Sequence, residues 1–534
     1  MSTLTLLSRR RFLMLAGSGL AAAALASCAP KQPATTTAPT AAPVESEATQ
    51  APDAEPTKAE AGQPSDAVVE VNYYFLAWGP MNDVELVQDA MSEITQDKIG
   101  CTVKLVPMDS SAFNERLKLD LAAGENIDLM YTCNWANDFY ANVRNGVLVA
   151  LDDLLPEYAP GLWASIKPEV WDAARVNGKL YGAINQQIWA TINGFDIRKD
   201  VVEALSFDVS TLDGLDTYDP FFQAVKDNMD GMYPTGWFNP NESPTWWTGM
   251  WGLDGVGPMT YMRWDDEETK LAFPWEYPEF EQAIEIARRW YTSEFLPLEP
   301  TSGEDFVAQM KAGMYACVPI NVAKPGRESE DKAKYGFDFL NIPIQAYSQP
   351  FVTTGSVVPT MNGLVRTCQN QEKAIRLLEL WNTDVEAYNL ICKGIKGKHW
   401  VWVDKERKII GFPEGITPEN SPYNPNTDWM FGNQFNAYYV DEAQAEANTW
   451  EKTRELNETS GTSKAMGFAF VQDPVANEVA QVTAADKEIG EPLRQGRLDP
   501  AENLPKYIEQ MKAAGAEKVF AEVQKQFDEW KASR

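Results

Sequence analysis

Hydrophobic residues from Val68 onward recur with two different periods. Apolar side chains fill most or alternate positions of residues 68–75, 102–106 and 127–131, a pattern typical of buried strands. Between them, residues 83–98 and 111–123 place apolar side chains at helical spacing, and Gly124 ends the second segment. Strands that alternate with helices of this length predict right-handed βαβ units around a parallel sheet.

The second half of the chain carries helical stripes. One stripe consists of Phe280, Ile284, Ala287, Tyr291 and Phe295, and another of Ile375, Leu378, Val385 and Tyr388. Each stripe places its apolar side chains on one helix face, which we expect to pack on the core. Near the C-terminus, Asp499, Pro500 and Glu502 combine an N-cap, a proline at the first helical position and a capping-box glutamate. The helical region that they open is interrupted at Gly515 and resumes as far as Trp530, so we expect a helical hairpin that docks onto a lobe.

Residues 1–28 show neither the strand period nor the helix period of the later chain. An arginine cluster precedes an apolar run over residues 12–26, about 15 residues and so shorter than the roughly 20 that span a bilayer. Residues 25–28, Leu-Ala-Ser-Cys, resemble a bacterial lipobox, and residues 8–13 resemble a twin-arginine signal. We therefore expect a signal peptide over residues 1–27 and a lipid anchor on Cys28 that holds the protein at the outer face of the cell membrane. The alternatives are an ordinary secretory peptide with an incidental cysteine, and export by the general route.

Composition bounds the class of the protein. Residues 28–66 are rich in Ala, Pro, Thr and Glu, which predicts a disordered tether that begins at the lipidated cysteine. About 500 residues remain after the signal, more than one hydrophobic core usually supports, so at least two lobes are expected. The formal net charge of −31 argues against a nucleic-acid partner, because binding to phosphates needs a basic patch. Five cysteines follow Cys28, an odd number without CxxC spacing, and we expect most of them to be buried and unpaired: Cys101, Cys133, Cys317, Cys368 and Cys392.

Few residues are candidates for catalysis or metal binding. His399 is the only histidine, which makes a zinc site of two histidines impossible, and no nucleophile elbow accompanies it. We assign it a structural role. Residues 227–231 resemble part of a calcium loop but lack the later glutamate that such a loop needs, so we expect no metal. Glycoside hydrolysis needs only two carboxylates, and the 77 acidic residues leave that hypothesis open.

Tryptophans carry the clearest ligand-binding signal. Six of them lie close together in sequence among Gly, Pro, Asn and Thr: Trp237, Trp246, Trp247, Trp251, Trp264 and Trp275. A single buried helix cannot hold all six, whereas sugar rings pack their flat faces on aromatic rings and bind Asn and Thr through their hydroxyls. Trp78 follows the first strand, and Asn134 and Trp135 follow the third, at the edge where open α/β sheets bind ligands. The alternative is that these tryptophans close the cores of the lobes.

Short motifs in a fixed order resemble a known family. They begin at Asn145 (NGVLVALDDLL), Val176 (VNGKLYGAI), Asn193 (NGFDIRKD), Ala312 (AGMYA) and Gly355 (GSVVP). In this order they resemble segments of the family 1 extracellular solute-binding proteins, the sugar-binding components of ABC importers. Residues 394–400, residues 431–435 and the ending over residues 468–530 resemble the LplA-like lipoproteins, which have a distinctive C-terminal domain.

The resemblance implies a two-lobed periplasmic-binding-protein fold of the α/β class. Each lobe would be a largely parallel sheet flanked by helices, with the ligand cleft at the hinge. Residues 68–187 and about 353–400 would form lobe one, and residues of about 188–352 and about 401–534 would form lobe two with the C-terminal helical region. Hinge segments line the cleft in such folds, so the candidate ligand-binding residues are Trp78, Asn134, Trp135, Gln187, Trp189, Trp246, Trp247, Trp251, Trp429 and Asn433.

The function implied by the resemblance is capture of a carbohydrate, an oligosaccharide in particular, by lobe closure. The protein would be a lipid-anchored, extracytoplasmic monomer that passes its ligand to ABC permease subunits, without a cofactor and without making or breaking a bond. Two alternatives remain open at this point. One is a surface glycan hydrolase or lyase, and the other is a glycan-binding adhesion protein without a transport role.

Overall fold

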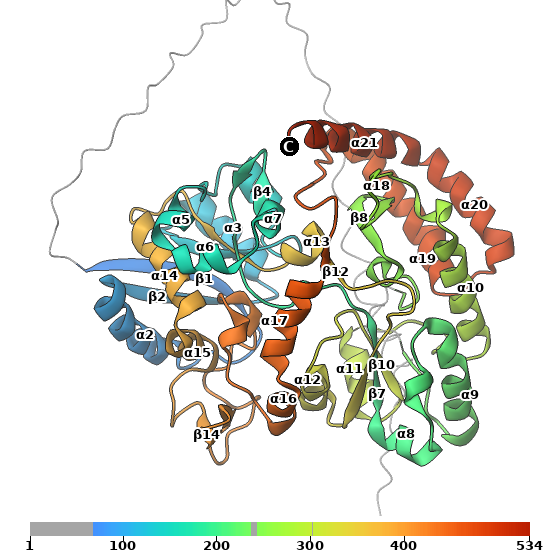
Figure 1. Ribbon diagram of the computed structural model, residues 1–534, viewed down its shortest axis with the longest axis horizontal. Coiled ribbons are helices and arrows are strands. Elements are labelled where there is room, and N and C mark those ends of the chain that lie inside the picture. The colour runs from blue at the N-terminus through green and yellow to red at the C-terminus, as the bar shows by residue number, and fades with distance from the viewer. Residues whose placement is uncertain (1–67, 237–242, 302) are drawn as a thin grey trace, which may run out of the picture. The chain divides into compact units, whose positions relative to one another are not determined.

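The computed structural model describes residues 68–236, 243–301 and 303–534 (Figure 1). The predicted signal peptide, Cys28 and the tether lie outside the described residues, and so does Trp237. Within these ranges no helix is long and apolar enough to cross a membrane.

The first lobe is built on a five-stranded sheet in the order β2-β1-β3-β13-β6. Its strands are β1 (Val69–Ala77), β2 (Cys101–Asp109), β3 (Leu129–Thr132), β6 (Ala183–Ile184) and β13 (Met361–Leu364). β1 pairs in parallel with β2 and β3, as the alternating pattern predicts, and α2 (Val84–Ile99) and α3 (Phe113–Ala123) are the crossover helices. β13 runs antiparallel to β3, and its first residue, Met361, lies beside Thr132, the last residue of β3.

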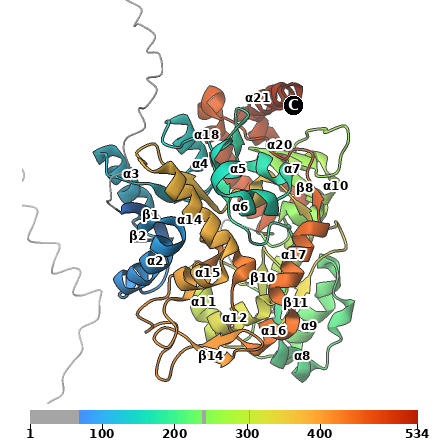
Figure 2. The same cartoon turned by 60° about the vertical axis from the view of Figure 1, so that its left-hand side comes forward.

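Helices α14 (Gln371–Thr383) and α15 (Val385–Lys393) pack beside α2 on this lobe (Figure 2). The stripe from Ile375 to Tyr388 predicts one helix, but the chain forms two, which separate at Asp384. The Asp384 carboxylate accepts hydrogen bonds of 2.9 Å from the backbone N–H groups of Glu386 and Ala387 and so caps α15. Aspartate favours this capping position over a helix interior, which explains the break.

The first lobe continues well beyond the expected boundary near residue 400. The Tyr423 hydroxyl donates to the carbonyl oxygen of Ile391 in α15 at 2.7 Å, and the Phe431 ring packs edge-on against Phe75 of β1 at 5.1 Å. The hydrophobic core of this lobe extends as far as Met466. The assignment of residues from about 401 to 466 to lobe two is therefore wrong, because this segment covers apolar side chains of β1 and α15.

The second lobe centres on β7 (Gly194–Arg198), which lies between β10 (Cys317–Ile320) and β11 (Phe339–Pro343). Both neighbours run antiparallel to β7 and therefore parallel to each other. The two-lobed α/β class is confirmed, but this sheet differs from the largely parallel one expected. The reason is that α12 (Arg327–Tyr335) carries the chain from β10 across to β11 on the far side of β7, so the parallel strands are not neighbours.

Further helices cover the second lobe. They are α8 (Lys199–Leu205), α9 (Asp219–Asn228), α10 (Pro278–Thr292) and α11 (Gly303–Lys311). α10 buries Phe280, Ile284 and Ala287, as its stripe predicts.

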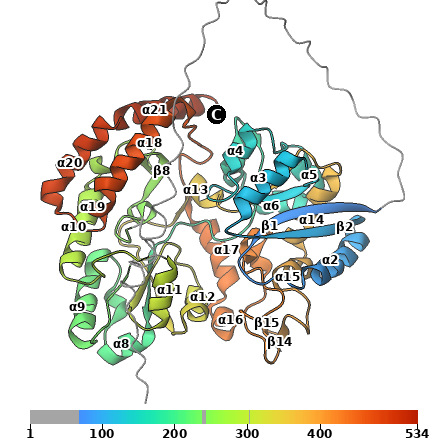
Figure 3. The ribbon, with the colours of Figure 1, turned by 180° about the vertical axis from the view of Figure 1, so that it is seen from behind.

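The C-terminal helices form a hydrophobic cluster with a β-hairpin of the second lobe (Figure 3). These elements are α18 (Ala476–Ala485), α19 (Glu491–Arg494), α20 (Pro500–Ala513), α21 (Ala516–Ala532), β8 (Leu253–Gly257) and β9 (Thr260–Arg263). Asp499 caps α20 by accepting from the Ala501 N–H group at 3.0 Å. Gly515, with φ of 98°, separates α20 from α21, so the two helices form the hairpin that the sequence predicts.

Three chain segments cross between the lobes side by side. The Thr191 N–H group donates to the Phe351 carbonyl oxygen at 2.8 Å, which joins the first crossing to the second. β12 (Phe351–Val352) then pairs in parallel with β16 (Gly461–Thr462), which joins the second crossing to the third. Position 461 requires glycine, because a Cβ there would lie 2.1 Å from the Trp264 ring that stacks on Phe351. The lobes are thus linked by one hydrogen-bonded ribbon.

Asn457, in α17 (Thr449–Thr459), ties the third crossing to the first. Its Oδ1 accepts from the backbone N–H groups of Trp189 at 2.8 Å and Ala190 at 3.1 Å. Its Nδ2 donates to the Gln187 carbonyl oxygen at 2.6 Å. Asn457 is only 8% exposed, so water has little access to replace these bonds.

Asn457→Ala should therefore destabilise the protein strongly. The substitution leaves buried backbone groups unpaired at about 1–3 kcal/mol each, so we expect denaturant melts to show a loss of about 2–5 kcal/mol in unfolding free energy. Asn228→Ala is the matched control, because Asn228 makes only an exposed bond of 2.8 Å to Ala224 within α9. The control should lose less than about 1 kcal/mol. Equal losses in the two variants would contradict the role given to Asn457.

Candidate functional site

Three of the predicted tryptophans come together at the carboxyl end of the first-lobe sheet. Trp78 follows β1, Trp135 follows β3, and Trp429 comes from the late segment that packs on this lobe. Trp429 lies 5.5 Å from Trp78 and 6.0 Å from Trp135 between ring centroids. Trp78 is 51% exposed and Trp135 is 49% exposed, which leaves aromatic surface available to a ligand. We call Trp78, Trp135 and Trp429 the aromatic platform.

The platform is held by backbone contacts to distant segments. The Trp135 indole Nε1–H donates to the Pro359 carbonyl oxygen at 3.0 Å, and the Trp78 N–H group donates to the Pro425 carbonyl oxygen at 3.0 Å. Gly79 permits the second contact, because a Cβ there would lie 2.2 Å from the Asn424 carbonyl oxygen. Large aromatic side chains are seldom left half exposed without a partner, so the platform is a candidate ligand surface.

Two cavities lie between the lobes. The smaller, about 260 Å³, has Asn134, Tyr140 and Thr354 on its first-lobe side and residues 254–257 of β8 on the other. The larger, about 790 Å³, is bounded by first-lobe residues and by α21. Tyr140 and residues 468–470 line both cavities, so the two cavities are neighbours. Asn134 lines the smaller cavity and directly precedes Trp135 of the platform in the sequence.

Asp254 is the buried carboxylate in the wall of the smaller cavity. Its Oδ2 accepts from the Ser463 hydroxyl at 2.6 Å, which links β8 to the third crossing. Burial raises the pKa of Asp254 to about 6, against the lowering effect of the Ser463 hydrogen bond. Near neutral pH this carboxylate is therefore an acceptor for a hydroxyl donor in the cavity.

The clustered tryptophans of the second lobe lie elsewhere. Trp251 is 1% exposed, donates through Nε1 to the Thr245 carbonyl oxygen at 2.9 Å, and stacks on Tyr347 at 4.2 Å. Trp246 packs edge-on against Phe280 at 4.8 Å, and Trp247 is half-buried against the same lobe's core. The structure does not bring these three to the platform. Their place in the core is the alternative that the sequence left open.

Of the three other predicted residues, Gln187 and Trp189 lie at the first crossing, and Asn433 lies in the first lobe beside Gln186. Gln187 contributes its backbone carbonyl to Asn457, as described above. Trp189 is 7% exposed and donates through Nε1 to the Asn185 carbonyl oxygen at 3.2 Å. The Asn433 side chain accepts from the Phe435 N–H group at 3.0 Å and caps a short turn. None of the three lines either cavity.

Sequence reasoning missed the walls of the cavities. Tyr140 lies in α4 (Phe139–Arg144), and its helix gives no signal that it faces another lobe. Asp254 is an acidic residue inside an apolar strand, and that pattern was a usable signal. Residues 468–470, Phe-Ala-Phe, read as core on hydrophobicity alone, although they line both cavities.

The remaining candidates, His399 and the five cysteines, have structural surroundings. His399 accepts at Nδ1 from the Ile395 N–H group at 2.8 Å and lies 3.0 Å through Nε2 from Asp83, beside the start of α2. The five cysteines after Cys28 are buried and free. Among the described residues no three His, Cys, Asp or Glu side chains are grouped as a metal site.

Asp254 should make stability depend on pH. Its folded pKa of about 6 exceeds the value of about 3.9 in an unfolded chain, so its contribution is complete below pH of about 4 and is lost as the pH rises through 6. Asp254→Asn removes this titration. We expect the stability of wild type relative to the variant to fall by about 2 kcal/mol between pH of about 4.5 and 8 in denaturant melts. The exposed Asp89→Asn control should show no such trend, and a flat difference for Asp254→Asn would contradict the assignment.

Comparison with known proteins agrees with this architecture. Residues 89–386 match a family described as bacterial extracellular solute-binding protein, and residues 464–532 match a domain of unknown function (DUF3502). A carbohydrate ABC transporter substrate-binding protein of Streptococcus pneumoniae serotype 4 is 23% identical over 475 residues, which cover 86% of this chain and 90% of the relative.

Solved structures share the fold. The N-glycan transport solute binding protein of Streptococcus pneumoniae has a TM-score of 0.76 at 19% identity and covers 86% of this chain and 98% of its own. Its complexes with Man1GlcNAc and Man5GlcNAc have TM-scores of 0.67 and 0.65, each at 19% identity; they cover 86% and 87% of this chain and 99% of their own chains. The family match extends over more than half of the 534 residues, and the chain therefore belongs to the bacterial extracellular solute-binding proteins.

Proposed function

We propose that this solute-binding protein captures an oligosaccharide and delivers it to an ABC importer. The observation that carries the proposal is the aromatic platform, which lies at the carboxyl edge of the first-lobe sheet, where Asn134 of the smaller cavity directly precedes Trp135. Sugar rings pack on exposed aromatic faces, and Asn134 and Asp254 offer hydrogen-bonding groups to hydroxyls beside them. The name of the pneumococcal relative and the glycans bound to the structural relative support the same class of ligand.

The size of the cavities favours an oligosaccharide over a single sugar. Pockets for ligands of drug size measure about 300–1,000 Å³, and the larger cavity alone has a volume of about 790 Å³. The platform lies beside the cavities and adds binding surface for at least one further ring. A monosaccharide would leave most of this space to water.

Lobe closure is the proposed mechanism. The platform belongs to one lobe and β8 to the other, so a ligand between them gains its full set of contacts only when both lobes enclose it. Ligand binding then shifts the population toward the closed state without any bond being made or broken. The permease would recognise the closed arrangement, in which both lobes present their surfaces together.

Platform variants test the proposal. Trp78→Ala should weaken binding of Man5GlcNAc, or of the tightest ligand in a glycan panel, by about 5- to 150-fold in calorimetry, since stacking on an aromatic ring contributes about 1–3 kcal/mol. Its melting temperature should barely change, because half of the side chain is exposed. Trp251→Ala is the core control, expected to lose about 3–5 kcal/mol of stability with unchanged affinity per folded molecule.

Three outcomes would contradict the proposed function. Wild-type protein that binds no glycan in the panel would leave the platform without a ligand. New reducing ends or unsaturated products from a bound polysaccharide would identify a hydrolase or lyase instead. Glycan binding without any effect on uptake in cells would favour the adhesion alternative.

We propose further that Cys28 carries a lipid anchor, on the basis of the lipobox resemblance. Cys28→Ser should release the protein from the membrane or block its processing, while the melting temperature remains that of the wild type. Cell fractionation and gel mobility report the two effects. A variant that stays membrane-bound at unchanged mobility would show that the anchor lies elsewhere.

A further inference from the structure

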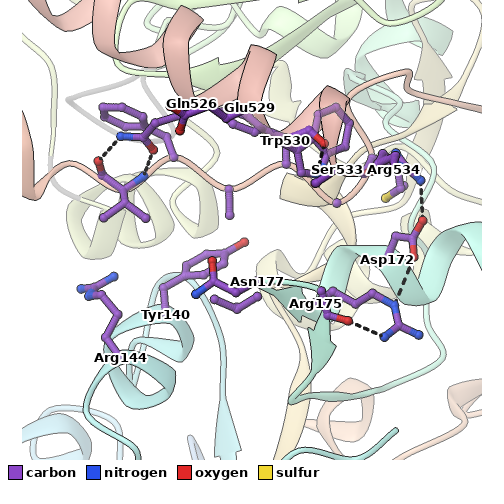
Figure 4. A pocket seen from close by; sticks show the side chains of 18 of the residues that line it. Tyr140, Arg144, Asp172, Arg175, Asn177, Gln526, Glu529, Trp530, Ser533 and Arg534 are labelled. Atoms are coloured by element: carbon purple, nitrogen blue, oxygen red, sulfur yellow. Dashed lines mark hydrogen bonds and ion pairs between the residues drawn. The ribbon is translucent and has the colours of Figure 1, made fainter.

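The larger cavity has walls from two parts of the chain that are far apart in sequence (Figure 4). On one side lie Tyr140 and Arg144 of α4 and Asn177, in the turn between β4 (Arg175–Val176) and β5 (Lys179–Leu180). On the other side lie residues 466–471 and the last turns of α21, which belong to the stretch that matches the domain of unknown function. The C-terminal domain therefore forms one side of this cavity, which shares Tyr140 and residues 468–470 with the smaller cavity.

The walls of this cavity are fixed by hydrogen bonds. Gln526 of α21 donates to and accepts from the backbone of Val471, with both distances 2.9 Å. Arg534 donates to the Met466 carbonyl oxygen at 2.9 Å and pairs with the Asp172 carboxylate of the first lobe at 2.5 Å. The segment over residues 466–471 is thus held against α21, and the C-terminal residue of the chain closes one end of the cavity.

Several polar groups in the lining are not used by these contacts. Arg144, Asn177 and Glu529 make no side-chain hydrogen bond or ion pair with any residue that the structure describes, and all three face the cavity. The Tyr140 hydroxyl is likewise without a partner among the described residues. Hydroxyls of a ligand can therefore bind these groups without breaking a contact of the protein.

The charges of the lining favour a neutral ligand. It contains three arginines and three carboxylates, although the chain as a whole carries a net charge of −31. Asp172 is matched by Arg175 at 3.2 Å and by Arg534, so no uncompensated charge gathers there. The cavity of about 790 Å³ is therefore lined by hydrogen-bond donors and acceptors without an excess of positive or negative charge. Such a lining suits an uncharged polyhydroxyl chain.

We propose that this cavity is a second glycan subsite, which holds the part of a branched or extended oligosaccharide that reaches beyond the aromatic platform. The C-terminal domain would then set the preference for ligand size, because it supplies one wall of the subsite. The inference rests on the proposed function, since the platform must hold the first part of the same glycan.

A comparison of two glycans of different size tests the subsite. The triple variant Arg144→Ala, Asn177→Gly, Glu529→Ala removes the three unused side chains at exposed positions and keeps Tyr140. Glycine replaces Asn177 because the backbone there has a φ of 51°, which glycine adopts readily. In calorimetry we expect it to bind Man5GlcNAc at least about tenfold more weakly than wild type, and Man1GlcNAc within about twofold. The double variant Arg116→Ala, Glu509→Ala changes exposed residues outside both cavities and should match wild type for both glycans.

The outcomes separate this inference from the proposed function. Wild-type protein that binds Man1GlcNAc without any gain in affinity for Man5GlcNAc overturns the subsite and leaves the proposed function intact. A triple variant that loses affinity for both glycans equally, or for neither, also overturns it. Wild-type protein that binds neither glycan contradicts both proposals. Melting temperatures within about 2 °C of wild type establish that the variants are folded.

Discussion

The ribbon of three chain crossings is the constraint on which the rest of the structure depends. Thr191, Phe351 and Gly461 stand in one hydrogen-bonded row, and Asn457 adds three bonds to the first crossing from the side. A ribbon of this kind can bend, but its strands cannot slide independently without leaving buried backbone groups unpaired. The ribbon therefore fixes how the three crossings are aligned with one another.

The site inherits its geometry from this alignment. The third crossing leads through Ser463, which holds Asp254 of the second lobe, into residues 466–470, which line both cavities. The second crossing leads through Thr354 to Pro359, which accepts from Trp135. Residues 466–470 and Thr354 thus place parts of the cavity walls only a few residues from a crossing.

The sequence could predict the parts of this arrangement that depend on local pattern. The first strands and helices, α10 and the α20–α21 hairpin follow from hydrophobic period, caps and glycine positions. Trp78 and Trp135 could be placed because they follow strands whose carboxyl ends meet at one edge. The motif order resembled the correct family and hence the two-lobed class.

Non-local packing could not be predicted in the same way. Trp429 was named from the family's hinge, but nothing local shows that its segment wraps back to stand beside Trp78. Trp251 and Trp429 are equally aromatic in the sequence, and only the tertiary fold makes one a core residue and the other a platform residue. The same holds for residues 401–466, whose lobe is decided by their contacts with α15 and β1.

Distance measurement between the lobes during binding tests the central claim most directly. Lys179→Cys and Lys525→Cys place dyes at exposed positions on the two sides of the larger cavity. Cys28→Ser removes one competing thiol, and the other five cysteines are buried and so are poorly accessible to the dyes. A saturating concentration of the tightest ligand found in a glycan panel should raise the energy transfer between the dyes and narrow its distribution, as closure around the ligand requires. An unchanged distribution while calorimetry shows saturated binding would contradict capture by lobe closure.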